Sequence, residues 1–175
     1  MIFRNHPLGR NILGRPDLLK KFRSEDDMAF TSRFYQPSNM VFFVLGDFNF
    51  QKIVRQVEKL LVDLPLVTVE NQRTIPPLYV PEQLVVHKET HQAHVMIGSR
   101  GYNAYDDKRT ALYLLNNILG GPGMNSRLNV SLRERWGLVY TVESKLTSYT
   151  DTGAFCIYFG TDPDDVDTCL KLTYK

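Results

Sequence analysis

Hydrophobic residues recur at two different spacings in the first half of the chain, and each spacing predicts a different element. The unbroken apolar run at 40–45 is typical of a strand buried on both faces, which needs a neighbouring strand on each side. Asn49 then precedes apolar residues at every third or fourth position, which predicts an amphipathic helix capped by this side chain. An earlier helix is predicted over 17–34, and the acidic cluster at 25–27 can divide it into two pieces.

The second half combines strand and helix patterns in an order that predicts an α+β fold. Strands are predicted at 84–87, 93–98, 138–145 and 154–159, and helices at 106–119, at 125–135 and from Pro163 onward. Gly137 follows the second of these helices and can take the left-handed backbone conformation that ends a helix. Leu128, Leu132 and Trp136 fall on one stripe of that helix, and we expect this stripe to be buried.

A proline-containing stretch, 67–83, separates the two halves. It has three prolines, few charges and no helical period, so it is predicted to be a linker between two domains, although a long surface loop would have the same composition. On this interpretation residues 1–66 are the end of a first domain, and residues 84–175 are the opening part of a second. We expect truncation at both ends, because nothing upstream of 40–45 supplies a neighbouring strand and the last helix runs to Lys175.

The composition is that of a globular protein without a strong charge bias. Hydrophobic residues make up 43% of the chain, and the formal net charge is +2, with no basic cluster longer than Lys20-Lys21. Nucleic acid and an anionic membrane surface are therefore not expected as partners, and no apolar run approaches the length of a membrane span. A soluble protein is expected, with the cytoplasm favoured and a periplasmic or organellar location left open. Cys156 and Cys169 are expected to be reduced.

Three histidines, His87, His91 and His94, lie close together in the sequence but do not form a recognised zinc motif. A zincin helix carries two histidines four apart on one face with a glutamate beside one of them, whereas Glu89 is central here. The flanking residues are strand-like, and along a strand the first two histidines stand about 13 Å apart while the third points to the other face. We expect these histidines on the surface and not around a metal.

A glycine-rich loop is one candidate for binding, and its candidate residues are Gly120, Gly121, Gly123 and Ser126. A phosphate-binding loop follows a strand and opens a helix, but this loop follows a predicted helix. Two interpretations stay open: a plain connection between two helices, or a loop whose exposed amides face a peptide backbone.

Arg133 and Tyr140 are the other candidates, seven positions apart across the predicted helix end. Arg133 lies about 100° around the helix from Leu132, towards the rim of the buried stripe. Beside a glycine loop, an arginine and a tyrosine could bind a carbonyl oxygen or a carboxylate. The alternative is an ordinary surface ion pair and a core aromatic.

Four segments occur in an order that is shared with a known family. His-Pro-Leu-Gly at 6–9 is followed by Gly14 and Asp17-Leu18, with leucine where the family has an aromatic residue, and Phe-Tyr-Gln-Pro-Ser-Asn-Met at 34–40 is followed by Gly-Asp at 46–47. Leu-Gly-Gly at 119–121 leads to Ser-Arg-Leu at 126–128, and Leu-Arg-Glu at 132–134 leads to Gly-Leu-Val-Tyr at 137–140. Together they resemble the insulinase/pitrilysin family of zinc metallopeptidases, in particular the branch that includes the mitochondrial processing peptidase subunits.

This resemblance implies a fold and an activity. Each half of such a protein has two similar α+β domains, each an antiparallel sheet backed by helices, and two halves close like a clam shell around a chamber for unfolded or extended peptides. One domain holds zinc on an inverted His-x-x-Glu-His helix with a more distant glutamate, and the motif glutamate activates the water. The opposing half supplies an arginine and a tyrosine that bind substrate. The resemblance carries these roles to Arg133 and Tyr140, and residues 120–126 would line the chamber.

The zinc motif of the family does not occur in this sequence. The chain by itself is therefore expected to hold no metal and to be inactive, with zinc in the full-length parent or in a partner. We expect a part of a zinc metalloendopeptidase that binds a peptide or unfolded polypeptide and pairs with a second subunit or half of the same family. A non-catalytic structural or docking subunit is the alternative. Self-association through 40–45, or pairing of that segment with the second sheet, is also expected.

Overall fold

The computed structural model describes residues 2–64 and 73–175, which form two compact units. One unit contains Met1–Arg10 and Thr74–Lys175, and the other contains Asn11–Arg73. The predicted linker at 67–83 lies partly outside the described residues, and its described part from Thr74 onward belongs to the larger unit. The domain boundary stays a prediction.

A three-stranded antiparallel sheet is the centre of the larger unit, and it confirms the predicted α+β fold. The strands are β1 (Ala93–Gly101), β2 (Val139–Ser148) and β3 (Gly153–Thr161), in the order β1-β3-β2. A short turn joins β2 to β3, so their pairing is local, whereas β1 pairs with β3 across a long stretch of sequence. Among the described residues, β1 and β2 are therefore the two edge strands of this sheet.

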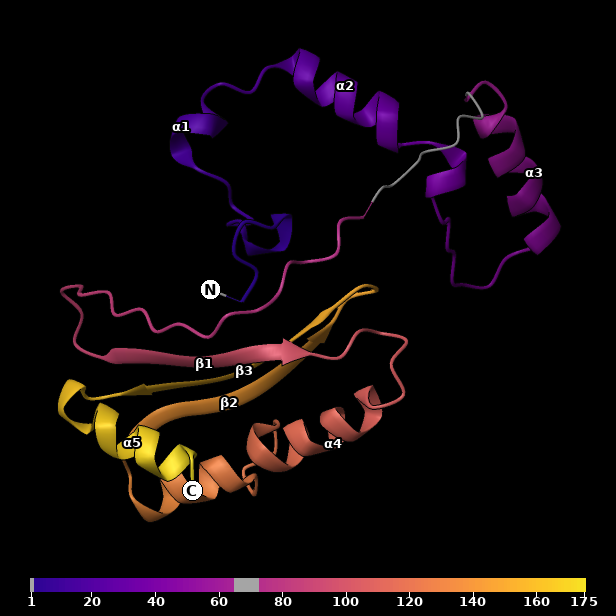
Figure 1. Cartoon of the computed structure of the whole chain (residues 1–175). Coiled ribbons are helices and arrows are strands. Elements are labelled where there is room, and N and C mark those ends of the chain that lie inside the picture. Colours follow the sequence, from indigo (N-terminus) through magenta and orange to yellow (C-terminus); the bar gives the residue numbers. More distant parts are fainter. Residues whose placement is uncertain (1, 65–72) are drawn as a thin grey trace. The chain divides into compact units, whose positions relative to one another are not determined.

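Two α-helices of the larger unit, α4 (Arg109–Gly120) and α5 (Val166–Thr173), lie on one face of the sheet (Figure 1). Between α4 and β2 the chain forms a π-helical segment, η3 (Asn129–Arg135), and a 3₁₀ turn, η4 (Pro163–Asp165), precedes α5. The core between helices and sheet contains Leu128, Leu132, Val139, Val142, Ile157, Phe159 and Cys169.

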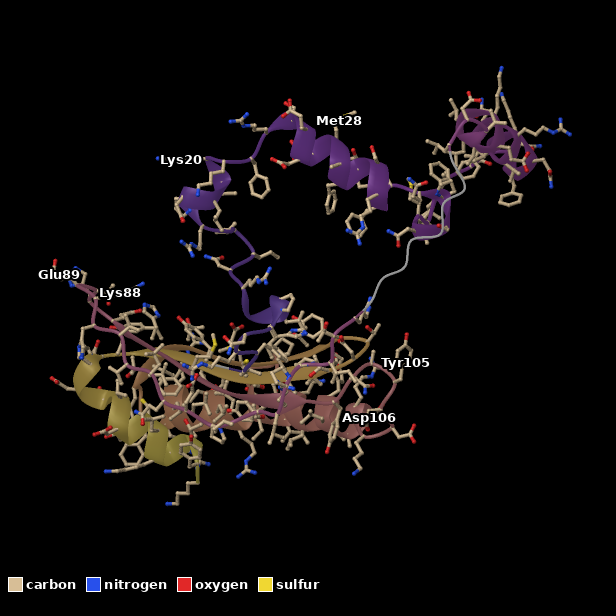
Figure 2. The ribbon with its side chains drawn as sticks, turned by 45° about the horizontal axis from the view of Figure 1, so that its top comes forward. Lys20, Met28, Lys88, Glu89, Tyr105 and Asp106 are labelled. Carbon is tan, nitrogen blue, oxygen red and sulfur yellow. The ribbon has the colours of Figure 1, made fainter. Side chains whose placement is uncertain are left out.

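α4 runs so that its C-terminal end lies beside β2. The helix begins near the end of the sheet that Tyr105 and Asp106 mark in Figure 2, opposite the end marked by Lys88 and Glu89, and it packs against β2. Residues that follow α4 therefore lie beside an edge of the sheet.

One residue of the predicted buried stripe lies elsewhere. Leu128 and Leu132 are buried, but Trp136 is 60% exposed. The hydrogen bonds of a π-helix run from residue i to i+5, which changes the side-chain period along η3 and takes Trp136 off the stripe. The prediction for Trp136 is therefore wrong.

The smaller unit is helical, with α1 (Pro16–Leu19), α2 (Ser24–Phe34), η2 (Pro37–Asn39) and α3 (Phe50–Leu61). The helix predicted over 17–34 occurs in two pieces, but the acidic cluster does not divide it: the break lies between Leu19 and Ser24, and residues 25–27 fall in the first turn of α2. The capping prediction is also confirmed, since Asn49 Oδ1 accepts a hydrogen bond from the Lys52 N–H over 3.1 Å. Within 2–64 and 73–175, no helix is both long and apolar enough to cross a membrane.

Two strand predictions are wrong, because 40–45 and 84–87 have irregular backbone. No strand in the described part of the chain pairs with 40–45, and its side chains are open to solvent, with Val41 96% and Phe43 79% exposed. An apolar run is a local signal, but a strand forms only where a neighbour completes its hydrogen bonds.

The N-terminal residues of the larger unit are anchored on β1 by Arg100. Its guanidinium donates to the carbonyl oxygens of Ile2, over 3.2 Å, and Pro77, over 2.8 Å, and lies 5.0 Å from the centre of the Phe3 ring. Gly98 leaves space for this segment, since an added Cβ would lie 2.7 Å from Ile2 Cδ1. Residues 2–10, including the short η1 turn (Pro7–Gly9), therefore pack on the sheet that is built much later in the sequence.

Candidate peptide-binding site

The glycine loop depends on very close packing between the end of α4 and β2. An added Cβ at Gly120 would lie 2.7 Å from the backbone nitrogen of Ser144, so a larger residue cannot fit without movement of the strand or helix. An added Cβ at Gly121 would lie 2.7 Å from the Cα of Asn117 in the preceding turn. The two glycines therefore allow the helix to end directly against the strand backbone.

A buried hydrogen bond holds this contact together. Ser144 Oγ donates to the carbonyl oxygen of Asn116 over 2.8 Å, and both residues are buried. The bond joins the last turn of α4 to the middle of β2, and the loop that leaves the helix is fixed at its first residues.

Gly123 and Ser126 contribute to the internal structure of the loop. The Ser126 N–H donates to Gly123 O over 3.0 Å, and Ser126 Oγ accepts from Asn129 Nδ2 over 2.9 Å. Ser126 is only 4% exposed. Gly123 and Ser126 are two of the six predicted site residues. The other four line one hollow at the surface, and these two do not.

The end of η3 positions Arg133. Leu132 is fully buried and fixes the segment on the core, so its neighbour Arg133 lies at the surface. Gly137 has φ +63°, the left-handed conformation predicted for it, and the chain reverses there. The N–H of Leu138 then donates to Leu132 O over 2.9 Å and closes the turn into β2.

A β-bulge presents Tyr140. Val139 is opposite Thr161 and Thr141 is opposite Gly160, so Tyr140 is an extra residue in β2 without its own partner on β3. A bulge changes the direction of side chains at the point where it occurs. Tyr140 is 65% exposed.

Arg133 and Tyr140 open onto the same hollow, which has a volume of about 440 Å³. We call it the loop-side hollow. Its walls are loop residues 120–122 with Met124, Asn129 of η3, and the edge of β2 along residues 140–145. The structure therefore brings together Gly120, Gly121, Arg133 and Tyr140 beside an edge strand.

Sequence reasoning missed two charged residues of this hollow, Glu143 and Lys145. They lie in the strand predicted at 138–145, but nothing in their spacing distinguishes an edge strand from a central one. The alternation along that strand was the available signal, since it places both side chains on the face away from Val142 and Ser144.

Neither cysteine has the character of a nucleophile. Burial raises the pKa of the Cys156 thiol, and Lys145, directly opposite on β2, only partly offsets this. Burial also raises the pKa of Cys169, which is fully buried and donates to Thr161 Oγ1 over 3.6 Å. Both are free thiols that stay protonated near neutral pH.

His87, His91 and His94 are exposed, as expected, and His94 and His6 make local contacts. His94 Nδ1 is hydrogen bonded to the Tyr158 hydroxyl over 2.8 Å, and the two rings are stacked. His6 Nδ1 accepts from the Leu8 N–H, which leaves Nε2 to donate to Thr74 O over 2.8 Å. Across residues 2–64 and 73–175, no three His, Cys, Asp or Glu side chains are close enough to hold a metal ion. The described residues therefore do not fit a zinc ion.

The larger unit is thus a helix-backed antiparallel sheet with a glycine loop, an arginine and a tyrosine beside one edge. The chain belongs to the family described as peptidase M16 inactive domain, which matches residues 21–175. The predicted relationship to zinc metallopeptidases is confirmed.

Curated relatives are named zinc proteases. An uncharacterized zinc protease of Streptomyces coelicolor is 32% identical over 180 residues, which cover 98% of this chain and 39% of the relative. The uncharacterized zinc protease YmxG of Bacillus subtilis is 34% identical over 157 residues, which cover 90% of this chain and 38% of the relative. The chain thus spans about two fifths of the length of these relatives.

Solved structures have the same fold. The crystal structure of a peptidase M16 inactive domain from Pseudomonas fluorescens has a TM-score of 0.83 at 24% identity, covering 98% of this chain and 42% of that one. A protease from Helicobacter pylori has a TM-score of 0.76 at 26% identity, covering 93% and 40%. The periplasmic protease PqqL from Escherichia coli has a TM-score of 0.63 at 21% identity, covering 90% and 18%.

Proposed function

We propose that this chain is the non-metal part of a zinc metalloendopeptidase, where it forms a wall of the chamber and binds the peptide substrate. The family match and the names of the relatives support the class of enzyme. One observation carries the finer role: Arg133 and Tyr140 open onto a single hollow that runs along an edge strand. The metal and the hydrolytic step belong to the full-length parent or to a partner subunit of the same family.

An extended peptide fits the edge of β2 for a simple reason. An edge strand leaves the outward N–H and C=O groups of alternate residues without a partner in its own sheet, and an extended peptide can pair with them. Residues 140–145 provide this edge, and the loop-side hollow lies next to it. Binding through the main chain is tolerant of sequence, which suits a chamber for unfolded polypeptides.

Arg133 and Tyr140 add polar contacts at one end of this edge. A guanidinium can donate two hydrogen bonds to a peptide carbonyl or carboxylate, and a phenol can donate one. Both side chains are exposed within the hollow, so neither has to be uncovered before it binds. In this proposal they orient the peptide, and they carry out no chemical step on this chain.

The test is peptide binding to the full chain, measured by fluorescence anisotropy with labelled extended heptapeptides. We expect Arg133→Ala to weaken binding by at least about tenfold, because a hydrogen bond to a charged group contributes about 1.5–3 kcal/mol. Tyr140→Phe should weaken it by less. Arg135→Ala is the matched control, since Arg135 is an exposed arginine of the same segment that does not line the loop-side hollow.

Equal affinity for the wild type and the Arg133→Ala and Tyr140→Phe variants would contradict the proposal. N-methylation of alternate peptide amides provides a second, independent comparison. It should abolish binding if the peptide pairs with β2, and it should have little effect if only side chains are recognised.

A structural or docking subunit is the second candidate, and the exposed run at 40–45 favours it. Val41, Phe43 and Leu45 are largely exposed, and an exposed apolar segment is typical of an interaction surface. We expect self-association, or pairing with a second half of the same family, that Val41→Asp and Phe43→Asp abolish. Sedimentation velocity would measure this, and a monomeric wild-type chain that gains no partner would exclude it.

A further inference from the structure

A second hollow lies among the helices of the larger unit. Its volume is about 630 Å³, and all its lining residues come from α4, η3, α5 and the residues that adjoin them. α5 packs beside η3, as Figure 1 shows near the C-terminus. We call it the helix-side hollow. Its volume is within the range of pockets that hold small molecules.

The charged side chains of the helix-side hollow all have the same sign. They are Arg127, Arg135 and Lys175, and among the described residues no Asp or Glu lines the hollow. Neither arginine forms an ion pair with any residue that the structure describes. We rest the site on these two arginines, and not on Lys175 at the end of the chain. Two guanidinium groups without a carboxylate partner make this hollow attractive to an anion.

A spacing of four residues places the two arginines on one side of their helical segment. Arg127, Ser131 and Arg135 follow one another at this interval, and side chains four apart are neighbours along a helix. All three line the helix-side hollow. Arg133 opens instead onto the loop-side hollow, so η3 directs its arginines into two separate hollows.

Much of the remaining wall is apolar. Leu119 of α4 and Leu172 of α5 are half-buried and pack against the core, so they present a fixed carbon surface. Tyr174 adds an exposed aromatic ring where α5 ends. A purely ionic ligand would leave this surface uncovered, whereas a ligand with an apolar or aromatic body beside its anionic group would cover it.

We propose that the helix-side hollow binds a small organic phosphate, with the phosphate group between Arg127 and Arg135 and the apolar body along the end of α5. A carboxylate has a single charge that one guanidinium fork can satisfy, whereas a phosphate monoester has nearly two charges and three acceptor oxygens, enough to engage both arginines. The Ser131 hydroxyl can donate one further hydrogen bond. This site is independent of the proposed function, since the two hollows share no lining residue.

The test is isothermal titration calorimetry of the full chain with three probes at one ionic strength: phenyl phosphate, inorganic phosphate and benzoate. We expect phenyl phosphate to bind about tenfold more tightly than either of the others, because inorganic phosphate lacks the ring and benzoate lacks the second charge. Binding of phenyl phosphate should weaken between about pH 8 and about pH 5, as the phosphate gains its second proton.

Arg127→Gln and Arg135→Gln are the decisive variants. Each should weaken phenyl phosphate by at least about tenfold, because hydrogen bonds between charged groups are lost. Both side chains are exposed, so the thermal melts should match that of the wild type. Arg109→Gln is the matched control, since Arg109 is an exposed arginine of α4 that does not line the helix-side hollow. In a phosphate-free buffer, Arg135→Ala stays a control for peptide binding.

Each contrary outcome overturns a stated part of the proposal. If the three variants and the wild type bind phenyl phosphate equally, the helix-side hollow is not the site. If benzoate binds as tightly as phenyl phosphate, the ligand is a carboxylate and a phosphate is excluded. If inorganic phosphate binds as tightly, the apolar wall takes no part and the organic body is excluded. If no probe binds, the inference fails, while the proposed peptide binding is unaffected.

Discussion

Ser144 Oγ on β2 and the carbonyl oxygen of Asn116 on α4 are 2.8 Å apart in a buried hydrogen bond, directly beside the place where Gly120 touches the strand. This single contact sets the distance between a helix end and an edge strand. The loop-side hollow lies next to it, so the geometry of the proposed peptide site depends on a bond that takes no part in binding.

Removal of the Ser144 hydroxyl should lower the stability of the fold. We expect Ser144→Ala to reduce the free energy of unfolding by about 1–2 kcal/mol, because a buried hydrogen bond between β2 and α4 is lost. Chemical denaturation monitored by circular dichroism would measure it. Ser99→Ala, at an exposed strand position, should stay within about 0.5 kcal/mol of the wild type. A similar loss in both variants would show that the bond does not matter.

The glycine at the helix end should be irreplaceable, unlike its neighbour in the loop. Gly120→Ala places a Cβ 2.7 Å from the backbone of Ser144 and should cost about 1–3 kcal/mol of stability and weaken peptide binding. Gly123→Ala is the matched control, because its added Cβ would meet only the movable side chain of Asn125. Thermal melts and anisotropy together would test this, and equal behaviour of the two variants would refute the packing argument.

At Gly137, in the turn after η3, a larger side chain should fit, but a residue that disfavours the left-handed backbone conformation should destabilise the fold. Gly137 has φ +63° and no atom within 4 Å of an added Cβ. Gly137→Ala should therefore destabilise by about 1 kcal/mol through conformation alone. Gly137→Asn should cost less, since asparagine enters the left-handed region more easily. If alanine and asparagine were equally tolerated, the left-handed turn would not constrain the site.

Buried thiols should make stability fall at alkaline pH. Burial raises the pKa of Cys169 above its ordinary value of 9.0, so the folded chain holds this proton to a higher pH than the unfolded chain does. The stabilisation is present below the pKa of the unfolded thiol and is lost as pH rises through the pKa of the folded one. Denaturation between about pH 8 and pH 10 should show a steeper decline for the wild type than for Cys169→Ala. Parallel curves would contradict this.

Local patterns predicted many of the elements correctly. Asn49 predicted the start of α3, and Gly137 was placed correctly at the end of η3. Capping, helix periodicity and glycine conformation depend on residues within one or two turns, so they can be read from a short window.

The two wrong strand predictions share one physical cause. The apolar run at 40–45 has the composition of a buried strand, yet its backbone is irregular and its side chains are exposed. A strand is completed by residues far away in the sequence, and composition does not say whether they are present. The bulge at Tyr140 is similar, since it exists only in relation to β3.

The sequence by itself determined the family, the helix-backed antiparallel class of fold, and the glycine, arginine and tyrosine residues that were worth examining. Only the tertiary structure decided that Arg133 and Tyr140 share a hollow with Gly120 and Gly121, that Gly123 and Ser126 lie apart from it, and that β2 is an edge strand. The reason is the range of the forces involved. Backbone preferences act between near neighbours, whereas a binding surface is formed where segments distant in sequence pack together.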